Sequence, residues 1–86
     1  MLIDGMAQID DLVAKGKLLL EDGKFDDALA CFDQALLLNL HDPELWNFKG
    51  VTLRSLGRYQ EALECFNKSL EIDPRDKFAS WFVIDT

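Results

Sequence analysis

The sequence has little of the chemistry on which enzymes and metal proteins depend. Its 86 residues contain one histidine, two cysteines and two prolines, and the five glycines are dispersed rather than clustered into a phosphate-binding loop. The single imidazole, His41, cannot form a nucleophilic set or a two-histidine metal site, and its polar surroundings predict an exposed loop residue. We therefore expect a protein that is not an enzyme and that has no metal and no cofactor.

Basic residues are also scarce. Nine Lys and Arg stand against sixteen Asp and Glu, giving a net charge of -7. A nucleic-acid backbone or an anionic membrane would on average be repelled, so the expected partners are proteins or peptides. The sequence contains neither an apolar run long enough to cross a bilayer nor a basic stretch followed by an apolar run at its start, and we expect a cytoplasmic protein.

The two cysteines do not predict a disulfide. Cys31 and Cys65 occupy the same place in two copies of one repeat, and so lie on neighbouring parallel elements. Packed helix axes are about 8–10 Å apart, whereas the Cα atoms of a disulfide lie about 4.4–6.8 Å apart. We expect two reduced, buried thiols.

The repeat is the strongest signal in the chain. A shift of 34 residues places 9–42 on 43–76 without a gap and matches ten of the 34 pairs identically. These pairs include both glycines of each copy, Gly16 with Gly50 and Gly23 with Gly57. Such a period is typical of stacked helical repeats, and it divides the chain into a lead (1–8), two units (9–42 and 43–76) and a final segment (77–86).

Each unit is predicted to be a helix, a turn and a helix. Gly23 and Gly57 mark the turns, and Asp42-Pro43 supplies an N-cap and a first-turn proline for the third helix, while Pro74 ends the fourth. The second helices are expected over 25–38 and 59–72. Their apolar stripes predict the core: Phe25, Ala28, Leu29, Phe32, Ala35 and Leu36, then Tyr59, Ala62, Leu63, Phe66 and Leu70.

Small residues within the helices predict close packing of each hairpin. Gly16 and Gly50 lie inside first helices, where glycine costs about 1 kcal/mol relative to alanine. We expect Ala28 and Ala62 to oppose them, with phenylalanine rings filling the space alongside.

The second unit carries a recognisable motif. The run Leu45-Trp46-Asn47-Phe48-Lys49-Gly50, followed by Leu56-Gly57-Arg58-Tyr59, Glu61-Ala62-Leu63, Phe66 and Asp73-Pro74, resembles a tetratricopeptide repeat (TPR). The first unit departs further from this pattern, with Leu12 in place of Trp46 and Leu40 in place of Pro74, which is typical of a terminal repeat. The resemblance implies an all-α fold of antiparallel helical hairpins stacked as a short right-handed α-solenoid.

The resemblance also implies a function. TPR arrays are protein-interaction scaffolds whose first helices line a concave face that holds an extended peptide or a helix of a partner. Mapping that face onto this chain gives seven candidate partner-binding residues: Val13, Lys17, Leu20, Asn47, Phe48, Val51 and Arg54. The alternative for Phe48 and Val51 is that they pack between adjacent first helices.

One TPR subgroup clamps the carboxylate at the end of a chaperone tail with lysine and asparagine side chains. The corresponding places here hold Val13, Lys17, Phe48, Phe78 and Phe82, and no anion-binding set remains, because the apolar side chains cannot supply charge-assisted hydrogen bonds. We therefore expect an apolar or amphipathic partner segment rather than an acidic tail.

The final segment, 77–86, resembles the start of a third unit. It is rich in large apolar residues, four of which are candidates for self-association: Phe78, Trp81, Phe82 and Ile84. Two explanations compete, since the chain is either part of a longer repeat array or buries this segment against another copy as a homo-oligomer. The alternative to a peptide-binding scaffold is accordingly a self-assembling structural module.

Overall fold

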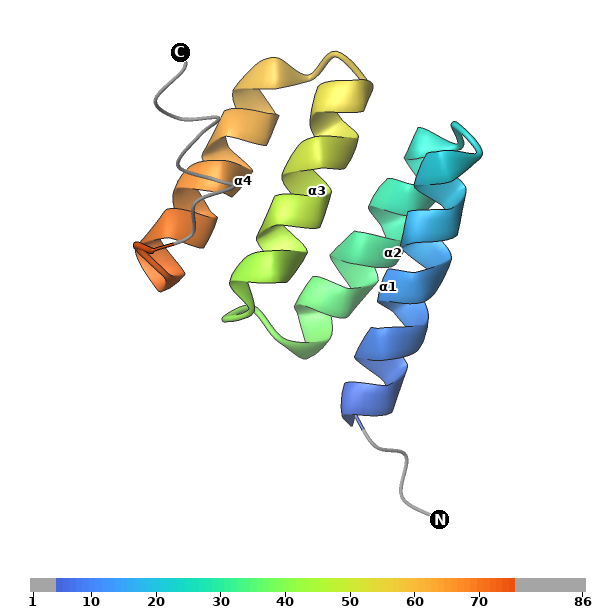
Figure 1. Cartoon of the computed structure of the whole chain (residues 1–86), viewed down its shortest axis with the longest axis horizontal. Coiled ribbons are helices and arrows are strands. Elements are labelled where there is room, and N and C mark those ends of the chain that lie inside the picture. Colours follow the sequence, from blue (N-terminus) through green and yellow to red (C-terminus); the bar gives the residue numbers. More distant parts are fainter. Residues whose placement is uncertain (1–4, 76–86) are drawn as a thin grey trace.

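A computed structural model describes residues 5–75, which form four helices in the order α1 (Gly5–Glu21), α2 (Phe25–Leu38), α3 (Pro43–Ser55) and α4 (Tyr59–Ile72). The helices pack pairwise in sequence: α1 with α2, α2 with α3, and α3 with α4 (Figure 1). The all-α fold of stacked helical hairpins is confirmed, and both second helices have the expected bounds. The first helix begins at Gly5, within the lead.

The two hairpin turns are built identically. Gly23 and Gly57 have φ angles of 75° and 79°, in the left-handed region that favours glycine. In the second unit the Gly57 amide donates to the Arg54 carbonyl at 3.0 Å, and the Arg58 amide donates to the Leu53 carbonyl at 2.9 Å. This pair of bonds is a Schellman motif, and it ends the first helix and turns the chain into the second.

The connection between the units is fixed by side chains. The Asp42 carboxylate accepts from the Glu44 amide at 3.0 Å, and Pro43 is the first residue of α3, as expected. The indole nitrogen of Trp46 donates to the Leu40 carbonyl at 2.8 Å. These bonds set the start of α3 against the end of α2.

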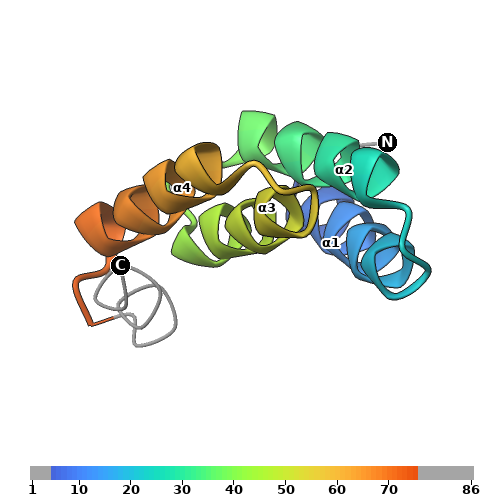
Figure 2. The ribbon, with the colours of Figure 1, turned by 90° about the horizontal axis from the view of Figure 1, so that it is seen from above.

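The helices form two layers. Figure 2 shows α1 and α3 side by side in one layer and α2 and α4 in the other. Two core clusters lie between them: Leu53, Ala62, Cys65 and Phe66 within the second hairpin, and Ala35, Leu36 and Leu45 where the two hairpins meet. The first helices of both units thus line a common face.

The glycines inside the first helices meet phenylalanine rings. A Cβ atom on Gly16 would lie 2.6 Å from the Phe32 ring, and one on Gly50 would lie 2.7 Å from the Phe66 ring. The phenylalanine rings thus lie beside the glycines, as expected from the sequence. Both alanines are buried, but the aromatic rings reach across the hairpin and occupy the space that a Cβ would need.

Tyr59 also differs from the sequence-based expectation. It was expected in the core stripe of the fourth helix, yet 69% of it is exposed. Tyr59 is the first residue of α4, where the chain leaves the turn at Gly57. The equivalent Phe25 is half-buried.

The two cysteines are free and buried, which confirms the predicted absence of a disulfide between them. Residues 77–86, with the expected self-association residues, lie outside the described part of the chain.

Candidate functional site: a hollow between the first helices

A hollow of about 330 Å³ lies on the face formed by the first helices. It is lined by Leu20 from the last turn of α1 and by Glu44, Asn47, Phe48 and Val51 from α3. The residues of α3 follow helical spacing, so one side of one helix forms most of the lining. Four of the seven predicted partner-binding residues therefore meet around one space.

Phe48 is the anchor of this hollow. Its ring stacks on the Phe32 ring of α2, with centroids 5.3 Å apart and planes inclined by 10°. The Lys17 ammonium lies over the Phe48 ring, 4.9 Å from its centroid. Such a contact stabilises both groups and brings the Lys17 stem along the aromatic surface. Phe48 thus contacts the inter-repeat core and also lines the hollow.

The other predicted residues have different surroundings. Val13 is half-buried and packs against the Ala35, Leu36 and Leu45 cluster, whereas Val51 packs against the core of the second hairpin and still lines the hollow. Arg54 is exposed in the last turn of α3. Phe48 and Val51 thus pack against neighbouring helices and also line the hollow.

The hollow is apolar except at Glu44 and Asn47. Glu44 is exposed in the first turn of α3 and, among the residues that the structure describes, is the only ionisable one in the lining. The nearby hydroxyl groups of Thr52 and Ser55 donate to the Phe48 and Val51 carbonyls at 2.8 and 3.0 Å. These hydroxyl protons are therefore engaged within α3. The lining therefore offers an apolar surface with the Glu44 carboxylate and the Asn47 amide beside it.

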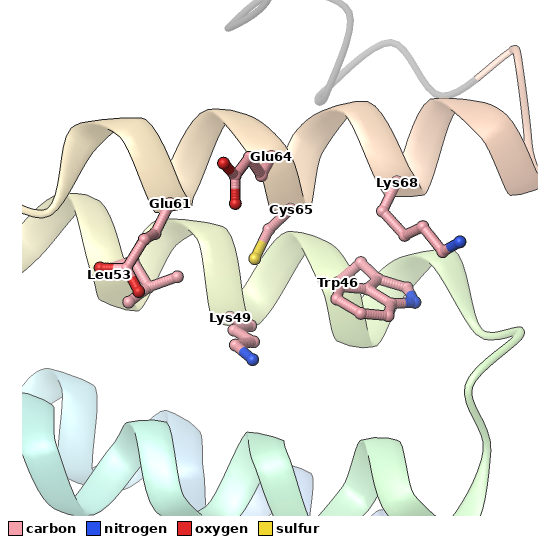
Figure 3. A pocket seen from close by; sticks show the side chains of 7 residues that line it. All are labelled: Trp46, Lys49, Leu53, Glu61, Glu64, Cys65 and Lys68. Atoms are coloured by element: carbon pink, nitrogen blue, oxygen red, sulfur yellow. The ribbon is translucent and has the colours of Figure 1, made fainter.

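Each hairpin also has a hollow of its own that the sequence did not predict. The one in the second unit, about 300 Å³, lies along α3 and α4 and is lined by Trp46, Lys49, Leu53, Glu61, Glu64, Cys65 and Lys68 (Figure 3). The one in the first unit, about 290 Å³, is lined by the residues 34 positions earlier: Leu12, Lys15, Leu19, Asp27, Ala30, Cys31 and Gln34. Because all seven positions correspond, the hollows are a property of the repeat.

The side chains around the hollow in the second unit are engaged in packing and ion pairing. Lys49 pairs with Asp33 of α2 at 2.8 Å and lies 5.8 Å from the Trp46 ring centroid. Burial raises the pKa of the Cys65 thiol to about 11. Figure 3 shows the Cys65 sulfur pointing from α4 toward α3. A thiol with this pKa is protonated at neutral pH and is a poor nucleophile.

Glu61, at the end of the same hollow, is held by an arginine. The Arg58 guanidinium donates to both carboxylate oxygens, at 2.6 and 2.8 Å. These hydrogen bonds lower the pKa of the Glu61 carboxyl and raise the pKa of Arg58. Glu61 is therefore a carboxylate at neutral pH rather than a proton donor.

Within the described residues, no group of three or more His, Cys, Asp or Glu side chains is placed to hold a metal ion. His41 is exposed, as expected, and its amide donates to the Asn39 side chain at 3.0 Å. Across residues 5–75, no helix is both long and apolar enough to cross a membrane.

An exposed apolar patch at the end of α2 was also missed. Leu37, Leu38 and Leu40 are 82%, 48% and 55% exposed. The second unit has Glu71, Ile72 and Pro74 at these positions. A comparison of the two copies could therefore have identified the three leucines as unusual for this surface.

The fold is that of an all-α protein built from repeated helical hairpins. Comparison with known families identifies which one: the tetratricopeptide repeat model matches residues 13–77, and the chain belongs to that family. TPR domains are generally protein–protein interaction modules and are typically non-catalytic. No curated protein matches the sequence.

Proposed function

We propose that this protein is a non-catalytic scaffold that binds a peptide or helix of a partner protein on the face of α1 and α3, with one apolar side chain of the partner in the Leu20–Phe48 hollow. The observation that carries the proposal is the hollow itself. It combines residues of both units in an apolar lining beside a single carboxylate.

The lining favours one kind of partner segment. An apolar side chain would remove Leu20, Phe48 and Val51 from water, which is the main source of affinity in such grooves. Glu44 at the edge favours a neighbouring lysine or arginine and disfavours an acidic residue. An acidic chaperone tail is therefore a poor fit, and a chain with a net charge of -7 repels it further. The two buried free thiols suit a reducing, cytoplasmic setting.

The test uses a library of displayed random peptides selected on the full chain. A selected peptide is then titrated calorimetrically against Leu20→Asp and against the matched control Leu37→Asp, which places the same charge on an 82% exposed residue outside the hollow. We expect Leu20→Asp to weaken binding at least about 10-fold, equivalent to about 1.4 kcal/mol, and Leu37→Asp to leave it unchanged.

Thermal unfolding of both variants must show that they remain folded. Equal affinity of a selected peptide for wild type and Leu20→Asp would overturn the placement in this hollow. Glu44→Lys supplies a second readout, because it should shift the selected peptides from basic toward acidic flanking residues.

A further inference from the structure

The lining of the hollow between the first helices follows the axis of α3. The residues that α3 contributes have helical spacing and lie along one side of it over about 10 Å: Glu44, Asn47, Phe48 and Val51. Leu20 of α1 forms the facing wall. The two helices run in the same direction (Figure 1). The lining thus favours a bound segment that lies along α3 rather than across it.

The lining offers few hydrogen bonds to the backbone of a bound segment. The side chains of Leu20, Phe48 and Val51 have no polar atoms, and among the described residues of the lining only Glu44 and Asn47 carry them. The nearby hydroxyl protons already bond to carbonyls of α3. An extended segment has an N–H and a C=O to satisfy at each residue, and those turned toward apolar side chains would lose water without gaining a partner. A helix pairs its own backbone groups, so the lining favours a helix.

Charge is distributed unevenly along the same face. On α3, Glu44 lies in the first turn and Arg54 in the last, about 15 Å apart along the helix axis. On α1, the exposed charged residues that share a face by helical spacing are Asp10, Lys17 and Glu21. Two carboxylates therefore lie where the two helices begin, whereas two cations and one carboxylate lie further along. The face is acidic at one end and, on balance, basic toward the other.

On the basis of the function proposed above, we propose that the partner segment is an amphipathic helix that runs antiparallel to α1 and α3. Its apolar residue enters the hollow, Asp or Glu in its first turn faces Arg54 and Lys17, and Lys or Arg in its last turn faces Glu44. A helix of about three turns spans this distance. Acidic first turns and basic last turns also suit the dipole of the bound helix, and its positive end then lies beside the negative end of α3.

Two synthetic helices, each held helical by a hydrocarbon link and carrying leucines on one face, test the orientation. The first has Glu in its first turn and Lys in its last, and the second has these charges exchanged. By calorimetry at low salt, the full chain should bind the first helix at least about 5-fold more tightly, because exposed ion pairs contribute modestly and are screened by salt. The variant with Glu44→Lys and Arg54→Glu should prefer the second helix. The matched control makes the same exchange at exposed positions outside this face, Glu64→Lys with Arg75→Glu, and should keep the wild-type preference.

The outcomes separate this proposal from the proposed function. Equal affinity for the two helices, or a wild-type preference for the second, would contradict the antiparallel orientation. Binding of extended library peptides that depends on Leu20, without binding of either helix, would rule out the helical partner and leave the proposed function standing. If no peptide of either kind binds at the hollow, the proposed function fails as well.

Paramagnetic NMR of the wild-type chain measures the orientation without any substitution in the protein. A nitroxide on the first residue of the first helix should broaden the amide signals of Arg54 and Ser55, and one on its last residue should broaden those of Glu44 and Leu45. The reverse pattern would establish a parallel helix and overturn the proposal. Equal broadening at both ends of α3 from either label would place the helix across the face and overturn it too.

Discussion

Gly50→Ala provides a direct test of how each hairpin is closed. In an ordinary helix interior this change would be favourable, because alanine is preferred over glycine by about 1 kcal/mol. Here the new Cβ would lie 2.7, 2.9 and 3.0 Å from three atoms of the Phe66 ring. Carbon atoms in normal contact are about 3.5–4.0 Å apart, so the ring has to move by almost 1 Å.

The ring has little room for that movement, because Phe66 is only 2% exposed and belongs to the core of the second hairpin. Overpacking of a core costs about 1–3 kcal/mol, and a displaced buried ring belongs in the upper part of that range. After the gain in helix propensity, the expected net loss is about 1–2 kcal/mol. For a chain of this size that corresponds to a drop of about 4–16 °C in the unfolding midpoint.

The assay is thermal and urea unfolding followed by circular dichroism, with Phe66→Leu as the second arm of a cycle. The shorter leucine leaves space for the Cβ, so Gly50→Ala should cost less in that background or become stabilising. The reasoning would be refuted by a Gly50→Ala protein that is more stable than wild type, or by the same cost in both backgrounds.

Three further outcomes follow from the packing and the titrating groups. Ala62→Leu should destabilise the fully packed second hairpin by about 1–3 kcal/mol, and a melting temperature no lower than that of wild type would contradict it. The Cys65 thiol titrates at about 11 in the folded chain and near 9.0 when unfolded, so its contribution to stability is complete below pH 9 and is lost as the pH rises through 11. In denaturation curves, the difference in unfolding free energy between wild type and Cys65→Ala should therefore become smaller as the pH rises from 9 to 11. Arg58 lowers the pKa of Glu61, so the stabilisation of the fold by this ion pair is complete above the ordinary carboxyl pKa and is lost as the pH falls through the lowered pKa. In Arg58→Ala, this contribution to the acid dependence of the unfolding free energy should be absent.

The turns and helix boundaries could be predicted because local chemistry determines them. Gly23 and Gly57 adopt positive φ angles that other residues resist, and Asp42 caps α3 through its own side chain. Each of these signals acts within a few residues of the chain. The 34-residue period then applies the same solution twice.

Contacts between helices were harder to predict, because periodicity identifies a face but not how far a side chain reaches across it. A phenylalanine ring was expected beside each glycine, but periodicity does not predict that the Phe32 ring comes within 2.6 Å of the position of a Cβ on Gly16. Tyr59 has the correct spacing for the core stripe and is nevertheless 69% exposed, whereas the equivalent Phe25 is half-buried.

In the candidate site too, the part formed by one helix could be predicted, whereas the contact between helices could not. The α3 side of the hollow follows from helical spacing, since Asn47, Phe48 and Val51 share a face. The meeting of that face with Leu20 depends on the packing of α3 beside α1, which no local pattern encodes. The ion pair of Lys49 with Asp33 likewise joins two helices, so no pattern within one helix predicts it.

Phe32 links this packing to the proposed binding face. Its ring covers Gly16 within the first hairpin and also stacks on Phe48, which lines the hollow. A side chain bound against Phe48 therefore presses on a residue whose position is set by the contact between the units. Because a ligand stabilises the state it binds, occupancy of the hollow should stabilise the stacking of both units rather than α3 alone. The contact that joins the repeats is thus part of the proposed binding surface, and substitutions at Phe32 should alter affinity although its side chain is fully buried.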